Sequence, residues 1–178
     1  INSHMADEGK KKYTSAEMQK WLFEKAAQTK DPKTVRKIVM SNDMRGRSTA
    51  MLGRMYFFKY NPIGRYDLPK YDKFPMCIPI ERYSNGFLGI NLHYLNGSTR
   101  AALLEILLRF KSEAVIDDQT KIIADYNTLK AFSALEKLAM PCVHRYVFTQ
   151  VRSKFIEVYP SEYNMAIQLP VEDWVFNQ

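Results

Sequence analysis

The stretch from Gly53 to Leu95 decides the fold, and it reads GRMYFFKYNPIGRYDLPKYDKFPMCIPIERYSNGFLGINLHYL. It is the segment of the 178-residue chain densest in strand-forming residues, and helix-like sequence flanks it on both sides. Alternation predicts a strand over Arg54–Tyr60 and two further strands over Met76–Tyr83 and Phe87–Leu95. Prolines and repeated Tyr-Asp pairs predict an ordered loop over Arg65–Pro75. The stretch therefore predicts a three-stranded antiparallel meander.

The hairpin between the last two strands carries a conflict of register. Asn85-Gly86 is a strong two-residue turn signal, but a strict turn there pairs Ile80 with Asn91 and sets an apolar face against a polar one. A one-residue bulge, or a longer loop, brings Ile78 and Ile80 level with the apolar residues of the return strand. Pro79 also favours a bulge or an edge position, because proline donates no backbone hydrogen bond. We therefore predict a bulge.

Helical periodicity flanks the meander on both sides, with capping residues and prolines at the first turns. The predicted helices run from Thr14 or Ser15 to Ala26, over Pro32–Met40, Thr99–Lys111 and Asn127–Leu138, from Pro141 to about Ile156, and from Pro160 to Pro170. In the tail, Trp174 and Phe176 are expected to dock on the body. The order predicts an α+β fold, in which a small antiparallel sheet from a central meander is packed among N- and C-terminal helices. An SH3-like barrel is one form that such a sheet can take.

Length and composition indicate one domain. Residues 1–5 have the form of an expression-tag remnant and residues 6–13 form a charged, disordered lead-in, which leaves 14–178 as a single α+β domain. Cys77 and Cys142 lie among apolar neighbours, so two buried thiols are expected and no disulfide is required. No apolar run approaches the roughly 18–20 residues that a bilayer span needs, so no membrane partner is expected.

The formal charge of +7 is unevenly distributed along the chain. Residues 9–73 hold 16 Lys and Arg against 6 Asp and Glu, whereas residues 74–178 hold 10 against 11. One face or end of the molecule is therefore expected to be basic, as in proteins that bind polyanions. The alternative is solubility charge on exposed helices.

Ligands for a metal ion are sparse. Cys142 and His144 are closely spaced, but a zinc site needs four ligands, so Cys77 and His93 would have to join them. His93 falls on the polar face of its predicted strand and is expected to be an ordinary surface or loop-bonded residue. No metal and no cofactor is expected.

Catalytic signatures are absent from the sequence, which contains no GKS or GKT phosphate loop, no GxSxG, no HExxH and no GxGxxG. Asp67, Asp72 and Glu81 are the carboxylates of a nuclease alternative. No Glu-x-Lys sequence completes that arrangement, so these residues are expected to pair with nearby Lys and Arg. We expect a non-enzymatic protein with no catalytic residues.

Basic and aromatic residues alternate through the first half of the meander, and this is the positive signal for function. Lys and Arg neutralise phosphates, and exposed aromatic faces stack on bases at about 1–3 kcal/mol each. Arg45-Gly46-Arg47 suits a narrow minor groove. Phe57 and Phe58 are expected to include core residues. The candidate nucleic-acid-binding residues are Arg45, Arg47, Arg54, Lys59, Arg65, Tyr66, Lys70, Tyr71 and Lys73.

Three runs carry a family resemblance: Gly53–Pro62, Leu68–Pro75 and Gly86–Leu95. Together they resemble small proteins encoded by large myovirus-type tailed bacteriophages, and 151–155 (VRSKF) and 169–172 (LPVE) look similar to the same group. The resemblance implies a viral accessory or virion-associated protein that handles phage DNA, and no catalytic residue carries over.

The expected function is that of a non-enzymatic bacteriophage accessory protein that binds DNA through a basic, aromatic-rich surface. A virion structural or assembly protein, or an inhibitor of a host protein, is the alternative, with the same surface making protein contacts. The expected location is the host cytoplasm or the virion.

Overall fold

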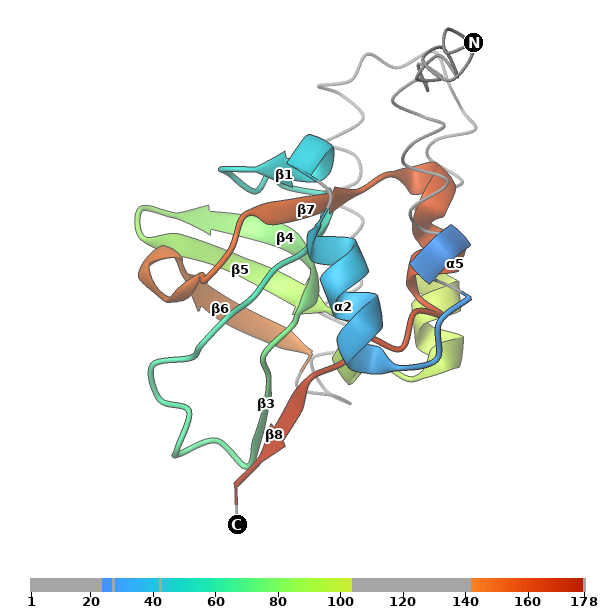
Figure 1. Cartoon of the computed structure of the whole chain (residues 1–178). Coiled ribbons are helices and arrows are strands. Elements are labelled where there is room, and N and C mark those ends of the chain that lie inside the picture. Colours follow the sequence, from blue (N-terminus) through green and yellow to red (C-terminus); the bar gives the residue numbers. More distant parts are fainter. Residues whose placement is uncertain (1–23, 27, 42, 104–141, 178) are drawn as a thin grey trace, which may run out of the picture.

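The computed structural model describes residues 24–26, 28–41, 43–103 and 142–177. Within these residues a six-stranded and a two-stranded antiparallel sheet are packed with helices, which confirms the α+β class (Figure 1). The strands are β1 (Gly46–Arg47), β2 (Met55–Phe57), β3 (Lys70–Asp72), β4 (Met76–Tyr83), β5 (Gly86–Asn91), β6 (Val143–Val147), β7 (Phe155–Val158) and β8 (Trp174–Phe176). The helices are α2 (Pro32–Met40) and α5 (Tyr163–Ala166), with a further helical segment at 97–103.

The larger sheet has the strand order β1-β7-β2-β4-β5-β6, so it is wider than the predicted meander. Its extra strands β6 and β7 come from the region predicted as a helix from Pro141 to about Ile156, and that prediction is wrong. The apolar residues there recur every four positions, a spacing that places side chains on one face of a helix and also on one face of a strand. These residues form strands because their backbone groups hydrogen-bond to neighbouring strands, β6 to the edge of β5 and β7 to the edge of β2. The SH3-like form stays a prediction.

The β4–β5 hairpin contains the predicted bulge. Ile78 lies opposite Ile90 and Glu81 lies opposite Leu88, with the register shift between Pro79 and Glu81. The turn itself is one residue earlier than Asn85-Gly86, because Gly86 already pairs in β5. The shifted turn and the bulge together keep the apolar side chains of the two strands on a common face.

Gly86 serves a close approach between strands. A Cβ at this position would lie 1.9 Å from the Tyr146 carbonyl oxygen in β6, which is backbone and cannot swing away. We expect Gly86→Ala to lower the free energy of unfolding by about 2–3 kcal/mol, measured by urea denaturation. Gly64→Ala is the matched control, since a Cβ there meets nothing within 4 Å, and it should be nearly neutral. An equal loss in both variants would contradict this explanation.

Both faces of the larger sheet are buried, and β2 shows how. Its alternate residues Met55 and Phe57 enter the main core with α2, α5 and the tail. Tyr56 and Phe58, with Tyr60 beyond the strand end, enter a second cluster that holds aromatic rings from β5, β6 and β7 and Cys77 from β4. The alternation was predicted correctly. Since both faces are buried at β2, the rings of Tyr56 and Phe58 pack inside the protein and offer no surface for stacking on bases.

Local sequence explains the helix starts. Asp31 caps α2 by accepting from Thr34 N at 3.2 Å, and Pro32 occupies the first turn, as predicted. Asn96 caps the segment at 97–103 by accepting from Thr99 N at 2.9 Å. The lead-in at 6–13, most of the first predicted helix, the helix at 127–138 and the end of the helix at 99–111 lie outside the described residues. The single-domain extent 14–178 stays a prediction.

The smaller sheet joins the predicted loop to the tail. Lys70–Asp72 was expected as loop, but it forms β3 and pairs with β8. Trp174 docks edge-on against Tyr94, with ring centroids 4.7 Å apart, whereas Phe176 stays 70% exposed. Both cysteines are buried and unbridged, as expected, and burial raises the pKa of the Cys77 thiol. Among the described helices, none has the length and hydropathy of a membrane span.

Candidate nucleic-acid interface

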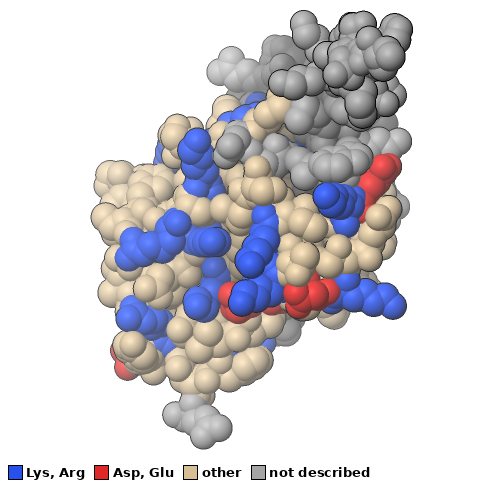
Figure 2. Space-filling view, in the orientation of Figure 1, with Lys and Arg blue, Asp and Glu red and all other residues tan. Residues whose placement is uncertain are grey.

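A hollow of about 730 Å³, here called the basic hollow, lies between α2 and the chain segments at 59–61, 73–74 and 152. Its charged lining consists of six cationic side chains and one carboxylate, that of Asp173. The cations are Lys33, Arg36, Lys37, Lys59, Lys73 and Arg152. Figure 2 shows Lys and Arg side chains spread over the face that α2 crosses, with few acidic groups among them. The hollow therefore carries a concentrated positive charge.

Helix geometry and chain crossings bring these cations together. Lys33, Arg36 and Lys37 have the i, i+3, i+4 spacing of one helix face, while Val35 and Val39 turn into the core. On the opposite wall, Tyr60 N donates to the Lys73 carbonyl at 3.1 Å, and Arg152 N donates to the Lys59 carbonyl at 2.8 Å. Those two backbone bonds hold three segments, distant in sequence, side by side.

The cations of the hollow fall into two groups. Arg36 lies 3.9 Å from the Asp173 carboxylate and donates to the Glu172 carbonyl at 3.1 Å, and Arg152 donates to the Thr149 carbonyl at 2.7 Å. The other four, here called the four exposed lysines, have exposed side chains and form no ion pair with a described carboxylate. They are Lys33, Lys37, Lys59 and Lys73. Four such ammonium groups on one concave surface suit a chain of phosphates.

Two of the predicted binding residues, Lys59 and Lys73, line the basic hollow. Arg65 and Tyr66 lie together outside it, with the guanidinium 4.6 Å from the ring centroid, and Tyr66 is 76% exposed. Lys70 Nζ sits 4.7 Å from the Trp174 ring centroid. These residues, from the loop and the start of β3, are here called the loop group of cations and rings, and they lie outside the basic hollow.

The remaining predicted residues are placed less favourably. Arg47 and Arg54 are partly exposed and approach the same Glu157 carboxylate, at 3.5 and 3.4 Å. Tyr71 is buried. Arg45 is 1% exposed and is held by Glu162, which leaves it no surface for a phosphate.

Sequence reasoning missed four residues of the hollow: Lys33, Arg36, Lys37 and Arg152. The helical spacing of the first three was a usable signal, because a basic face opposite a Val/Ile stripe is visible in PKTVRKIVM. Arg152 had no local signal. It was assigned to a helix, and only the pairing of its backbone with Lys59 brings it to the site.

A second hollow of about 270 Å³, here called the aromatic hollow, lies between the loop at 62–68 and β6. Five rings line it, together with the polar side chains of Asp72, Asn91 and Arg145. The rings belong to Tyr60, Tyr71, Tyr94, His144 and Tyr146. Burial, with the nearby Asp72 charge, raises the pKa of Tyr94 to about 12, and burial also raises the pKa of Tyr60 and Tyr146, so these phenols are neutral near pH 7. Tyr60 lines both hollows.

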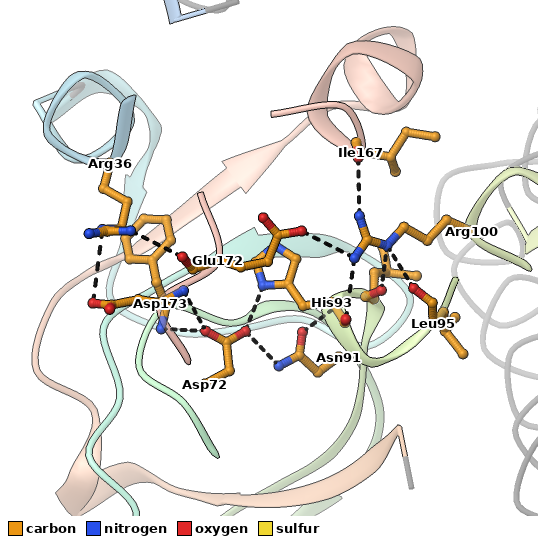
Figure 3. Close-up of polar contacts among 11 residues, drawn as sticks. Arg36, Asp72, Asn91, His93, Leu95, Arg100, Ile167, Glu172 and Asp173 are labelled. Carbon is orange, nitrogen blue, oxygen red and sulfur yellow. Dashed lines mark hydrogen bonds and ion pairs between the residues drawn. The ribbon is translucent and has the colours of Figure 1, made fainter. Parts of the chain in front are cut away.

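A buried polar network is centred on Asp72, which also lines the aromatic hollow with Asn91 (Figure 3). Asp72 accepts from Asn91 Nδ2 at 3.0 Å and from Phe74 N at 2.9 Å, and its carboxylate lies 2.6 Å from His93 Nδ1. The prediction of His93 as a surface or loop-bonded residue is wrong: it is buried with Asp72, and the backbone leaves the strand for a 3₁₀ turn at Leu92. Arg100 donates to the His93 carbonyl at 3.2 Å, which ties the network to the segment at 97–103.

The three carboxylates of the nuclease alternative are not gathered by the fold. Asp72 is buried in the network, Asp67 is exposed on the loop, and Glu81 lies on β4 opposite Leu88. The expected pairing of Asp72 with Lys or Arg is wrong, since its partners are His93 and Asn91. Among the described residues, no group of three or more His, Cys, Asp or Glu side chains is placed to hold a metal ion.

The Asp72 network should make stability depend on acid pH. Burial alone raises the pKa of Asp72, but the hydrogen bonds and charge from its partners outweigh burial and hold the pKa below its ordinary value near 4. A carboxylate with a lowered folded-state pKa stabilises the fold above about pH 4, and this contribution is lost as the pH falls below that value. In urea denaturation between pH 2.5 and 6, Asp72→Asn should flatten the acid limb, whereas Asp67→Asn, at an exposed site, should not. An unchanged limb in Asp72→Asn would contradict the assignment.

The chain matches the model of the phage T4 terminal DNA protecting protein family over residues 10–178. The chain belongs to this family. No curated protein matches it, and no solved structure does. Membership of the terminal DNA protecting protein family confirms the resemblance to small proteins of myovirus-type phages. It makes the chain a phage accessory protein with nucleic acid as its partner.

Proposed function

We propose that this protein binds the ends of phage DNA and shields them, with the DNA backbone held in the basic hollow. The observation that carries the proposal is the convergence of six cations around one concave surface with a single carboxylate among them. Each phosphate neutralised by Lys or Arg releases condensed counterions, which favours binding without reading sequence. A binding mode that ignores sequence suits a protein of a family described as protecting terminal DNA.

The loop group of cations and rings extends the proposed surface. Arg65 and Tyr66 lie on the loop that leads from the basic hollow along the aromatic hollow, and Lys70 begins β3 at the end of that loop. Arg47 and Arg54 add charge beside Glu157, at the opposite end of the sheet from β6. Arg45 does not contribute to the proposed contact, since its guanidinium is buried and forms an ion pair with Glu162.

End protection is tested by comparing linear and circular DNA of one sequence. Radiolabelled linear duplex is incubated with a processive exonuclease and increasing protein, while affinity for the linear and the covalently closed circular form is measured across a salt series. The proposal expects slower digestion of the linear form, tighter binding to it than to the circle, and a steep loss of affinity with salt. Unchanged digestion at saturating protein, or a salt-independent affinity, would overturn it.

A contact with other proteins is the second candidate. Met44 and Met51 flank β1 and are 49% and 42% exposed, and methionine is enriched at protein interfaces. A virion or host protein seated at β1 would place the molecule in the particle or in the infected host. Sedimentation with purified particles, and its loss in Met44→Lys with Met51→Lys, would support the virion partner. Absence of the protein from washed particles would exclude a virion partner.

A further inference from the structure

The aromatic hollow has the size and lining of a site for one nucleobase. Its volume of 270 Å³ corresponds to about nine liquid-water molecules at roughly 30 Å³ each, which is room enough for a base, whose bonded atoms pack more closely than water molecules. His144 and Tyr94 already lie ring over ring, with centroids 4.4 Å apart and planes tilted by 32°. The four tyrosine rings of the hollow are buried, whereas His144 is half-buried and forms the outer ring of the stack. A partly exposed aromatic ring of this kind is a platform on which proteins stack single-stranded bases.

Charge and continuity indicate that the occupant of this hollow is part of a nucleic acid. Arg145 lines the hollow and is exposed, with its guanidinium over the Tyr83 ring, and Lys70 Nζ lies over the Tyr94 ring, 5.5 Å from its centroid. The Asp72 carboxylate also lines the hollow, but it is held by His93 and Asn91. Tyr60 forms a wall common to this hollow and to the basic hollow. A nucleotide chain whose phosphates lie along the four exposed lysines can therefore pass Tyr60 and place its next base among the rings.

We infer that the aromatic hollow receives an unpaired terminal nucleoside of the DNA, while the basic hollow holds the backbone behind it. The inference rests on the proposed function and adds the means by which an end is distinguished from the interior of a duplex. A base inside a duplex must be unpaired and unstacked from both neighbours before it can enter a protein pocket, at a considerable free-energy cost. A terminal base has one neighbour, and an overhanging base has no pairing partner, so the same hollow fills far more readily at an end.

Two variants block the hollow without touching the core. Gly64 lines it, and a Cβ there meets nothing within 4 Å, so Gly64→Leu is expected to place its side chain in the space of the hollow. Leu68 also lines it and is 38% exposed, so Leu68→Glu places a carboxylate where the nucleotide would lie. Gly97→Leu is the matched control, since Gly97 also has open space around its Cα and lies in neither hollow.

The experiment mixes the full-length protein with DNA duplexes that carry 2-aminopurine, a base analogue whose fluorescence falls when it stacks. Three duplexes of one sequence carry the probe in a single-nucleotide overhang, at an internal paired position, or internally with both ends closed by hairpins. We expect quenching for the overhang alone, and we expect Gly64→Leu and Leu68→Glu to abolish it and to weaken binding of the open duplex by about tenfold or more. Both variants should bind the hairpin-closed duplex as the unmodified protein does.

The outcomes separate this inference from the function on which it rests. Equal quenching at terminal and internal positions, or quenching that persists in both variants, overturns the inference and leaves backbone binding by the basic hollow in place. Loss of particle binding in both variants with quenching retained assigns the hollow to a protein contact and also overturns it. Failure of the unmodified protein to bind any of the duplexes at low salt overturns the proposed function, and the inference with it.

Discussion

Replacing the four exposed lysines with glutamine is expected to weaken DNA binding by about 10²–10³-fold near 0.15 M salt. The variant carries Lys33→Gln, Lys37→Gln, Lys59→Gln and Lys73→Gln. Each ammonium that contacts a phosphate contributes about 0.9 to the slope of log K against log salt, so the slope should become shallower by about 3–4. Fluorescence anisotropy with a labelled duplex across a salt series measures both quantities. The fold should persist, because these side chains are exposed and carry no described ion pair.

A matched control removes the same charge elsewhere. Lys25, Lys30, Arg82 and Lys154 are exposed and do not line the basic hollow, so their joint replacement by glutamine lowers the net charge equally. Long-range attraction falls to the same extent in both variants, whereas phosphate contacts in the hollow are lost only in the first. A control as weak as the hollow variant would show that binding depends on overall charge, and the basic hollow would lose its role.

The second large effect is expected on stability. Arg45 and Glu162 form a buried, bidentate ion pair, in which Arg45 Nη1 donates at 2.7 Å and the side chains are 1% and 8% exposed. Arg45 also donates to the Glu157 carbonyl at 3.2 Å, and Glu162 accepts from Tyr159 N at 2.9 Å. Removing one partner leaves a buried charge without compensation, so Glu162→Ala should cost about 3–5 kcal/mol of unfolding free energy. Urea denaturation monitored by tryptophan fluorescence measures the loss.

The neighbouring half-exposed pair provides the control for that measurement. Arg54 is 39% exposed and lies 3.4 Å from Glu157, and Arg47 approaches the same carboxylate at 3.5 Å. Arg54→Ala should therefore cost less than about 1 kcal/mol, because solvent screens the pair and Arg47 remains beside Glu157. Equal losses in Glu162→Ala and Arg54→Ala would contradict the distinction between the buried and the exposed pair.

Local patterns predicted the parts of the fold that local physics decides. The extent of β4, the bulge beside Pro79 and the start of α2 at Pro32 all follow from alternation, register and first-turn proline preference within a few residues. The strands β6 and β7 could not be predicted in this way. Their valines recur at a spacing common to helix and strand, and only the edges of β5 and β2, far away in sequence, decide between the two.

In the candidate site, too, features set by local sequence were predicted and features set by distant segments were missed. Basic charge in the first part of the chain predicted a cationic surface, and Lys59 and Lys73 lie on it. Residue type alone could not show that Arg45 is buried, because its partner Glu162 is contributed by a distant segment. The burial of His93 was missed for a similar reason, since Asp72 joins it from β3, a strand that forms only when the tail supplies β8.

The position of β7 has a consequence for the order in which the molecule can assemble. This strand lies between β1 and β2, although nearly the whole chain must be synthesised before it exists. Until then, one edge of β2 has no partner, and Met55, Tyr56 and Phe57 present open hydrogen-bonding groups beside large apolar side chains. Pairing across so long a loop is slow, and an open edge of this composition is a template for association between nascent copies. In an infected cell making the protein quickly, the interval between the synthesis of β2 and that of β7 is the period of greatest risk of aggregation.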